Sequence, residues 1–264
     1  MAKSSATEAK KKRVPPWVGD YFRQAYDSLE RLIQVIHVSR RGIAGIQALP
    51  RLTKALAKVE GKEEDPNKAK LVEEDAALAK SEVEKDFPVL HTLAVVALWS
   101  WLEHLIKGLL AESLAKTPKH VQAPSFNKLK VKLSDYLPLN KREQAAYLVE
   151  LLEQETSAAL KRGVNRFESL LAPLGLSGEV PDTTAKAIFE LQQVRNAIVH
   201  QNGRCDRRLR SSCPWLKIKI GAQITVGAEQ LDVYSHAVGD YALDVLYRIG
   251  DQNGVNLRQD ESDT

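Results

Sequence analysis

The chain has 264 residues, of which 44% are hydrophobic and 27% charged, and its formal net charge is +4. A chain of this length and apolar content can bury one sizeable core, and no shift in composition demands two independent globules. Its two cysteines, Cys205 and Cys213, are too few to staple a domain of this size. We therefore exclude a disulfide-stapled fold and expect free thiols in a reducing compartment.

The sequence has no evident membrane span or secretory signal. Its longest apolar run, residues 92–102, is about half of what a bilayer requires, and Glu103 and Lys107 follow on the same predicted helix. Residues 1–13 carry lysines but lack the apolar stretch of a secretory signal. We therefore expect a cytoplasmic protein with no membrane contact.

The N-terminal third of the chain predicts helices of increasing polarity. Residues 1–16 are expected to form a disordered basic tail, and the spacing of apolar residues over 17–49 predicts a long amphipathic helix, either continuous or broken near Gly42. Residues 51–85 are rich in charge. The segment 61–66 in their midst is typical either of a turn between two polar helices or of a flexible linker.

The middle of the chain predicts the central helix of the fold. Residues 87–115 are the most apolar helical segment, and Thr117-Pro118 ends it. We expect its tryptophans, Trp99 and Trp101, to serve packing rather than base stacking. A short element precedes Pro138, and a longer helix is expected over residues 141–171.

The C-terminal part predicts two further helices with a hairpin between them. Helix-start residues follow Pro181, apolar residues recur at helical spacing as far as Ile198, and Gly203 is a natural stop. Residues 215–226 alternate apolar and polar side chains around Gly221, which predicts a small β-hairpin, and residues 228–249 return to helix. The expected segments are a tail at 1–16, a helical extension at 17–85, an all-α helical domain at 86–250 and a disordered tail at 251–264.

A polar trio, Arg195, Asn196 and His200, lies within the last two turns of the helix that precedes Gly203. At about 100° per residue, Asn196 and His200 share one side of the helix, whereas Arg195 is turned away from His200 by roughly 140°. One helix therefore cannot aim Arg195 and His200 at the same atom. A second copy of the helix, packed antiparallel in a two-fold dimer, would bring both side chains into one cleft.

The trio and its flanking residues resemble a known family. Arg195-Asn196, three further residues and His200, followed by Gly203, resemble the Arg-polar-x3-His signature of the HEPN superfamily, the higher eukaryotes and prokaryotes nucleotide-binding domain. Residues 93–110 resemble an earlier helix of that family, with Glu103 in the place of its acidic residue. The resemblance covers about residues 86–250. It implies a helical bundle that forms a homodimer and cuts RNA without metal or cofactor.

The resemblance also implies a biological setting and roles for residues. A toxin or an anti-phage effector is expected, with an antitoxin or a nucleotidyltransferase as a further partner. In cleavage by the 2′-hydroxyl, His200 would act as general acid or base, Arg195 would neutralise the phosphorane and Asn196 would orient His200 or a phosphate oxygen. Glu103 has two interpretations, as the partner that holds Arg195 or as an interfacial carboxylate.

A block of basic residues follows the trio directly. It begins with four arginines between residues 204 and 210 and continues with Lys217 and Lys219. Such clusters attract phosphate backbones by releasing counterions. The alternative is a solvated loop with incidental arginines. We expect RNA contacts from the arginines of this block, which are Arg204, Arg207, Arg208 and Arg210.

Two other interpretations stand beside the ribonuclease. A catalytically inactive HEPN-like module would hold RNA or a nucleotide as an adaptor, and a structural scaffold would use Arg195 to bind a bundle carboxylate and His200 to cap helix carbonyls. A zinc site is not predicted, because Cys-x7-Cys is not a usual structural spacing. That site would draw on Cys205, Cys213, His200 and His236.

Overall fold

The computed structural model describes residues 13–61, 63 and 65–258. Over these residues the chain forms ten α-helices joined by loops and short 3₁₀ turns, and it contains no strand. This confirms the predicted all-α class. The helices are α1 (Pro16–Ile46), α2 (Leu49–Glu60), α3 (Pro66–Glu84), α4 (Pro88–Lys116), α5 (Leu133–Tyr136), α6 (Lys141–Glu155), α7 (Val164–Leu171), α8 (Asp182–His200), α9 (Arg207–Ser212) and α10 (Ala228–Gln252).

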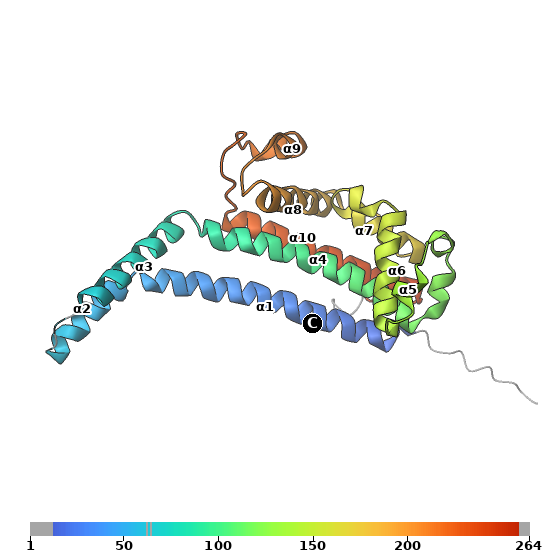
Figure 1. Cartoon of the computed structure of the whole chain (residues 1–264), viewed down its shortest axis with the longest axis horizontal. Helices are drawn as coiled ribbons and strands as arrows, with labels where there is room; N and C mark the ends of the chain where they lie inside the picture. Colours follow the sequence, from blue (N-terminus) through green and yellow to red (C-terminus); the bar gives the residue numbers. More distant parts are fainter. Residues whose placement is uncertain (1–12, 62, 64, 259–264) are drawn as a thin grey trace, which may run out of the picture.

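Helix α4 is the centre of the fold, as its apolar sequence predicts. Helices α1, α6, α8 and α10 all pack against it, and Figure 1 shows α1, α4 and α10 running alongside one another. Leu98, Leu102 and Ile106 are fully buried along its length. Trp99 is also buried, and the indole of Trp101 donates to the carbonyl of Ala25 at 3.0 Å, which confirms that both tryptophans serve packing.

Helix α4 is also more apolar along its whole length than the run at 92–102 indicates. It is long enough to cross a membrane, and an 18-residue window within it reaches a mean hydropathy of 1.5. The reason is that Leu105, Ile106 and Leu109 continue the apolar pattern beyond Glu103. In the fold these residues are buried in the core, as expected for the central helix of a bundle.

Helix α1 belongs to the same core as α4. Val18, Phe22, Leu29 and Ile36 recur at helical spacing and are buried in the common apolar cluster. The helix continues without interruption through Gly42, so of the two forms left open by the sequence the structure has the continuous one. A glycine inside a helix costs only about 1 kcal/mol relative to alanine, which the packing of α1 on α4 can offset.

Helices α2 and α3 form what we call the arm. Of the described residues between them, Gly61 adopts a left-handed conformation with φ of 64° and Asp65 caps α3 by accepting from the N–H of Asn67. Of the two interpretations of residues 51–85, the pair of polar helices is therefore confirmed. Figure 1 shows the arm projecting beyond the end of the bundle.

The single helix expected over residues 141–171 is wrong, because two helices occupy this stretch. Helix α6 ends at Glu155 and α7 begins at Val164. Between them, Ser157 and Gly163 both have positive φ, of 50° and 56°. Gly163 also lies so close to α8 that an added Cβ would sit 3.0 Å from the Cα of Phe189. Apolar periodicity continues across the break, but these two residues leave the helical conformation.

The predicted β-hairpin at residues 215–226 is also wrong. Pro214–Leu216 form a 3₁₀ turn, which removes the first expected strand. The second half pairs with a different segment, since the N–H of Ile224 donates to the carbonyl of Gly203 at 2.8 Å and the N–H of Cys205 donates to the carbonyl of Ala222 at 2.9 Å. An alternation of apolar and polar side chains is compatible with this isolated pairing as well as with a hairpin, because in both cases one side of the extended segment is buried.

The expected tails lie mostly outside the described residues. This holds for residues 1–12 and 259–264. Pro16, placed in the expected N-terminal tail, is the first residue of α1. At the other end α10 continues to Gln252, and the following turn is held by a pair between Arg258 and Asp251 at 2.9 Å.

Candidate functional site

Helix α8 carries the predicted trio, and its first four turns are packed into the core. Ile188, Leu191 and Val194 are buried at helical spacing where α8 packs on α4 and α10. The helix ends at His200, and Asn202 and Gly203 follow with φ of 51° and 71°. The N–H of Gly203 then donates to the carbonyl of Ile198, which satisfies one of the last helix carbonyls.

Two polar residues in the buried part of α8 were not identified from the sequence. Glu190, only 5% exposed, accepts hydrogen bonds from the indole of Trp215, from Gln230 at 2.7 Å and from Tyr234 at 2.9 Å. The side chain of Gln192 accepts from the N–H of Gly163 at 2.7 Å. The sequence does carry one sign of this role, because helical spacing places Glu190 on the apolar side of the helix. These residues join α8 to its neighbours.

The trio lies beyond this network, where α8 reaches the surface. Arg195 is half-buried and its Nη1 donates to Oδ1 of Asn196 at 3.3 Å. The buried Nε of Arg195 has no hydrogen-bond partner among the described residues. The side chain of His200 is exposed and forms neither a hydrogen bond nor an ion pair with the part of the chain that the structure describes. The polar groups at this end of α8 are therefore largely uncommitted.

Asn196 and His200 line one small pocket of about 130 Å³. Gln193 contributes a buried amide to it, and Arg208 and Asp206 come from the start of α9. Arg195 is not among the lining residues, which agrees with its angular position on the helix. One chain thus brings together an imidazole, three side-chain amides, a guanidinium and the carboxylate of Asp206, the third amide being that of Gln201. The guanidinium of Arg195 is not part of the lining and reaches the pocket only through its hydrogen bond to Asn196.

Helix α9 places part of the basic block beside His200. It packs on α8, and Figure 1 shows it above the end of that helix. Asp206 begins it by accepting from the N–H of Leu209 at 2.7 Å. Arg204 and Arg210 each donate to a backbone carbonyl, at 2.9 and 3.0 Å. Arg207 and Arg208 are exposed and have no partner among the described residues, so these two remain available to an anion.

Glu103 lies in a different cluster from the trio. Its carboxylate pairs with Arg166 at 2.8 Å, and Arg166 also pairs with Glu153 at 2.7 Å. Lys107 completes this cluster between α4, α6 and α7. Burial alone would raise the pKa of Glu153, but Lys107 and Arg166 hold it below its usual value. Glu103 has no contact with Arg195 among the described residues, so its first expected role is not seen within one chain.

The cysteines and histidines do not gather into a metal site. Cys205 and Cys213 are free and buried. Burial, with a smaller contribution from Glu190, raises the pKa of the Cys213 thiol to about 12. Over the described residues no group of three or more histidine, cysteine or acidic side chains is placed to hold a metal ion.

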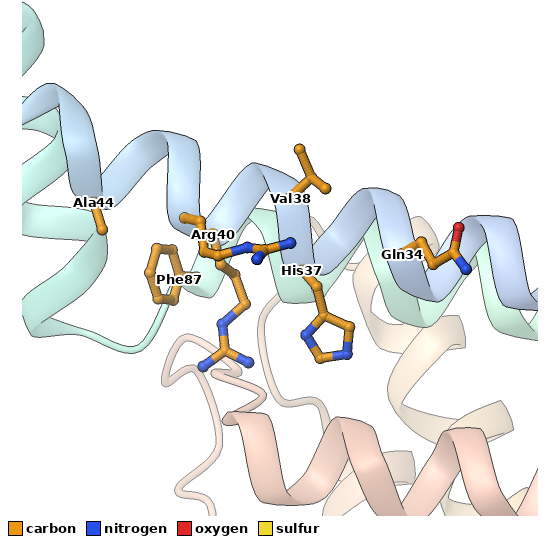
Figure 2. Close-up of a pocket in the computed structure, with 7 residues that line it drawn as sticks. Gln34, His37, Val38, Arg40, Ala44 and Phe87 are labelled. Carbon is orange, nitrogen blue, oxygen red and sulfur yellow. The ribbon is translucent and has the colours of Figure 1, made fainter.

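A larger groove of about 810 Å³ lies along α1, away from the trio. Figure 2 shows Phe87 and Ala44 near one end of it and Gln34 near the other. Its polar side chains include His37 and Arg40, and the Arg40 guanidinium lies 5.1 Å from the centre of the Phe87 ring. Arg40 is also 3.7 Å from a carboxylate, that of Asp86. None of the predicted site residues lines this groove.

Comparisons of the chain with protein-family models, curated proteins and solved structures find no match. A functional assignment therefore depends on the chemistry at the end of α8. There, Arg208 can neutralise a phosphate, Asn196 can hydrogen-bond one of its oxygens and His200 can give or take a proton. This set of groups suits an anionic substrate whose reaction needs proton transfer.

Proposed function

We propose that the pocket at the end of α8 binds RNA and cleaves it without metal, as in HEPN-type ribonucleases. The observation that carries this proposal is that Asn196 and His200 line one pocket with Arg208. The imidazole is exposed and uncommitted within the described residues, as a group that must exchange protons with a substrate has to be. Arg207 and Arg208 extend the positive surface along which an RNA backbone would lie.

The proposed reaction is a transphosphorylation. The 2′-oxygen of a ribose forms a bond to the adjacent phosphorus, the bond from phosphorus to the 5′-oxygen breaks, and a 2′,3′-cyclic phosphate remains. The imidazole of His200 in one protomer accepts the proton of the 2′-hydroxyl, and the imidazolium of His200 in the other protomer gives a proton to the departing 5′-oxygen. Arg208 and Asn196 hold the phosphate oxygens while negative charge grows on them.

A second copy of the chain would complete this site. Asn196 holds the guanidinium of Arg195 outside the pocket of its own chain. Two α8 helices packed antiparallel about a two-fold axis would bring the Arg195 of each chain toward the His200 of the other. Val199, which is 47% exposed between these residues, offers an apolar contact for such packing. The proposed enzyme is therefore a homodimer with composite sites.

The biological role proposed with this activity is that of a toxin or an anti-phage effector in the cytoplasm. Uncontrolled RNA cleavage harms its own cell, so an antitoxin or a modifying nucleotidyltransferase is the expected restraint. The same pocket without turnover would make the protein an RNA-binding adaptor. Turnover separates these two functions.

The decisive experiment is cleavage of a mixed RNA pool in the presence of EDTA. Wild-type protein should cut the pool, and His200→Ala should lose about 10²- to 10⁴-fold of the rate, which is the usual contribution of a general acid or base. His236→Ala is the matched control, because His236 is also exposed and only contacts a carbonyl of its own helix. Its rate should equal that of wild type.

Each result of this experiment has a distinct meaning. Cleavage that persists in His200→Ala contradicts the proposed chemistry. RNA that is bound but never cut favours the adaptor, and the binding should then weaken steeply as salt rises, because released counterions oppose it. A protein that neither binds nor cuts RNA contradicts both functions and leaves the structural scaffold.

A further inference from the structure

The α2 helix of the arm turns its largest apolar side chains to solvent. Leu49, Leu52, Leu56 and Val59 are 37%, 54%, 60% and 85% exposed. None of the residues of α2, all of which the structure describes, is buried. A contiguous apolar stripe of this kind on a folded protein marks a surface that another element covers.

The spacing of these four residues is that of a helix-packing seam. Intervals of three, four and three residues place all of them on one side of α2, as at the a and d positions of a coiled coil. The half-buried residues of α2, Thr53 and Ala57 among them, are smaller. Helix α2 thus keeps its larger apolar residues for a second contact.

Helix α3 carries a matching feature. Leu71 and Leu78, seven residues apart and therefore on the same side, are 61% and 65% exposed. The inner side of α3 is formed by Val72, Ala76 and Ala79, which are half-buried or buried. A pair between Lys54 and Glu73 at 3.0 Å joins α3 to α2. The arm therefore presents an outward apolar stripe on each of its two helices.

The two helices of the arm also have opposite charge. Helix α2 contains three basic residues and one acidic residue, whereas α3 contains three basic and five acidic residues. The acidic residues of α3 include Glu74 and Asp75, which lie between Leu71 and Leu78 in the sequence. Each helix of the arm is therefore electrostatically complementary to the other helix of an identical arm.

We propose that the arm is a homodimerisation surface, on which the arms of two chains pack as an antiparallel four-helix bundle. A two-fold axis would place the α2 of each chain against the α3 of its partner, so that basic meets acidic twice and the apolar stripes are buried together. Packing α2 on α2 would instead oppose like charges. Figure 1 shows the arm extending away from its own bundle, which leaves these stripes open to a second chain.

This surface is separate from the pocket at the end of α8, and the inference does not rest on the proposed function. It adds a contact between chains that would persist whether or not RNA is cut. If both contacts form, they link the same two chains when they share one two-fold axis, and otherwise they build a larger assembly.

The first test is the mass of the full chain by sedimentation equilibrium at micromolar concentration. In a Val199→Glu background, which removes the proposed α8 contact, Leu52→Glu/Leu56→Glu should halve the mass of the assembly and raise the dissociation constant of the arm contact about 100-fold or more. Both side chains are exposed, so the fold should survive, and the helical circular dichroism checks this. The control is Leu160→Glu, which replaces a leucine that is 83% exposed outside the arm and should leave the mass unchanged.

The second test uses charge and decides whether the partner is an identical arm. One variant makes α2 acidic by Arg51→Glu/Lys58→Glu, and another makes α3 basic by Glu74→Lys/Asp75→Lys. Each alone should associate more weakly than wild type, whereas an equimolar mixture should form heterodimers, because an all-acidic arm then meets an all-basic one.

Val199→Glu, on α8, should leave association through the arm intact. Four results would overturn the inference. They are a monomeric wild type, a Val199→Glu chain that no longer associates, a Val199→Glu assembly whose mass is unchanged by Leu52→Glu/Leu56→Glu, and charge-reversed chains that do not recover association when mixed. Absence of RNA cleavage with an intact arm contact would affect only the proposed function.

Discussion

The two ends of α8 differ in whether their polar side chains have hydrogen-bond partners. In the buried part, Glu190 accepts hydrogen bonds from three side chains and Gln192 accepts one from the backbone of Gly163. At the exposed end, His200 has no partner among the described residues and the Nε of Arg195 is buried without one. One helix thus carries residues that hold the fold together and, two turns later, residues that do not.

The free energy of burial explains why this difference is informative. A buried polar group without a hydrogen bond costs about 1–3 kcal/mol, so a folded chain usually provides partners, as it does for Glu190. Nε of Arg195 departs from this rule, as do Nε2 of His91 and Nε of Arg166, and a ligand or a second chain is one source of the missing acceptor. The predictions below test this division between a structural and a functional end.

The largest effect on stability is expected for Glu190→Ala. The substitution leaves the buried hydroxyl of Tyr234 and the side-chain amide of Gln230 without their acceptor. We expect the free energy of unfolding to fall by about 3–4 kcal/mol, measured by urea denaturation. Glu190→Gln retains one acceptor oxygen and should lose less. A loss below about 1 kcal/mol for the alanine variant would mean that this network does not support the fold.

A smaller loss is expected for Gly163→Ala, which affects the contact between α8 and the start of α7. Alanine at a φ of 56° is strained, and its Cβ would lie 3.0 Å from the Cα of Phe189. We expect a loss of about 2 kcal/mol in urea denaturation. Gly239→Ala is the control, because no atom lies within 4 Å of its added Cβ and α10 is helical there. That variant should be neutral or slightly more stable, and equal losses in both would contradict the explanation.

The helices and the breaks between them show how much of the fold can be predicted from the sequence. The central place of α4 and the extents of α8 and α10 follow from apolar spacing and from Pro181 and Gly203, which are local signals. The break before α7 depends on the approach of α8 to Gly163, which is a tertiary contact. The pairing of Ile224 with Gly203 rather than within a hairpin is a choice between partners that alternation alone does not make.

The same limit applies to the site. Helical spacing predicts that Asn196 and His200 share one side of α8 and that Arg195 points elsewhere. Asn196 and His200 do line the same pocket, and Arg195 does not. Arg208 reaches that pocket only because the chain turns after Gly203 and α9 packs back on α8. Glu190 occupies an apolar position whose burial could be read from spacing, but its three donors come from segments distant in sequence.

Alkaline pH should lower the free energy of unfolding through Cys213, a buried thiol whose pKa Glu190 helps to raise. Burial raises the pKa of the Cys213 thiol from its usual 9.0 to about 12. A raised pKa in the folded state means that the stabilisation is present below pH 9 and is lost as pH rises toward 12. Between about pH 9 and 10, Cys213 should contribute a fall of up to about 1.4 kcal/mol per pH unit. Cys213→Ala should show a shallower fall over this interval, and an unchanged slope would contradict the assignment.

The smallest effect on stability is expected at the functional end. His200→Ala removes an exposed side chain that has no partner among the described residues, so the free energy of unfolding should change by less than about 0.5 kcal/mol. Thermal and urea denaturation of the variant and of His236→Ala should give the same values as wild type. A loss above about 1 kcal/mol would instead indicate that His200 caps the carbonyls at the end of α8, a structural role. An unchanged stability combined with lost cleavage would separate the two ends of α8 completely, because the residue that the reaction needs would be one that the fold does not.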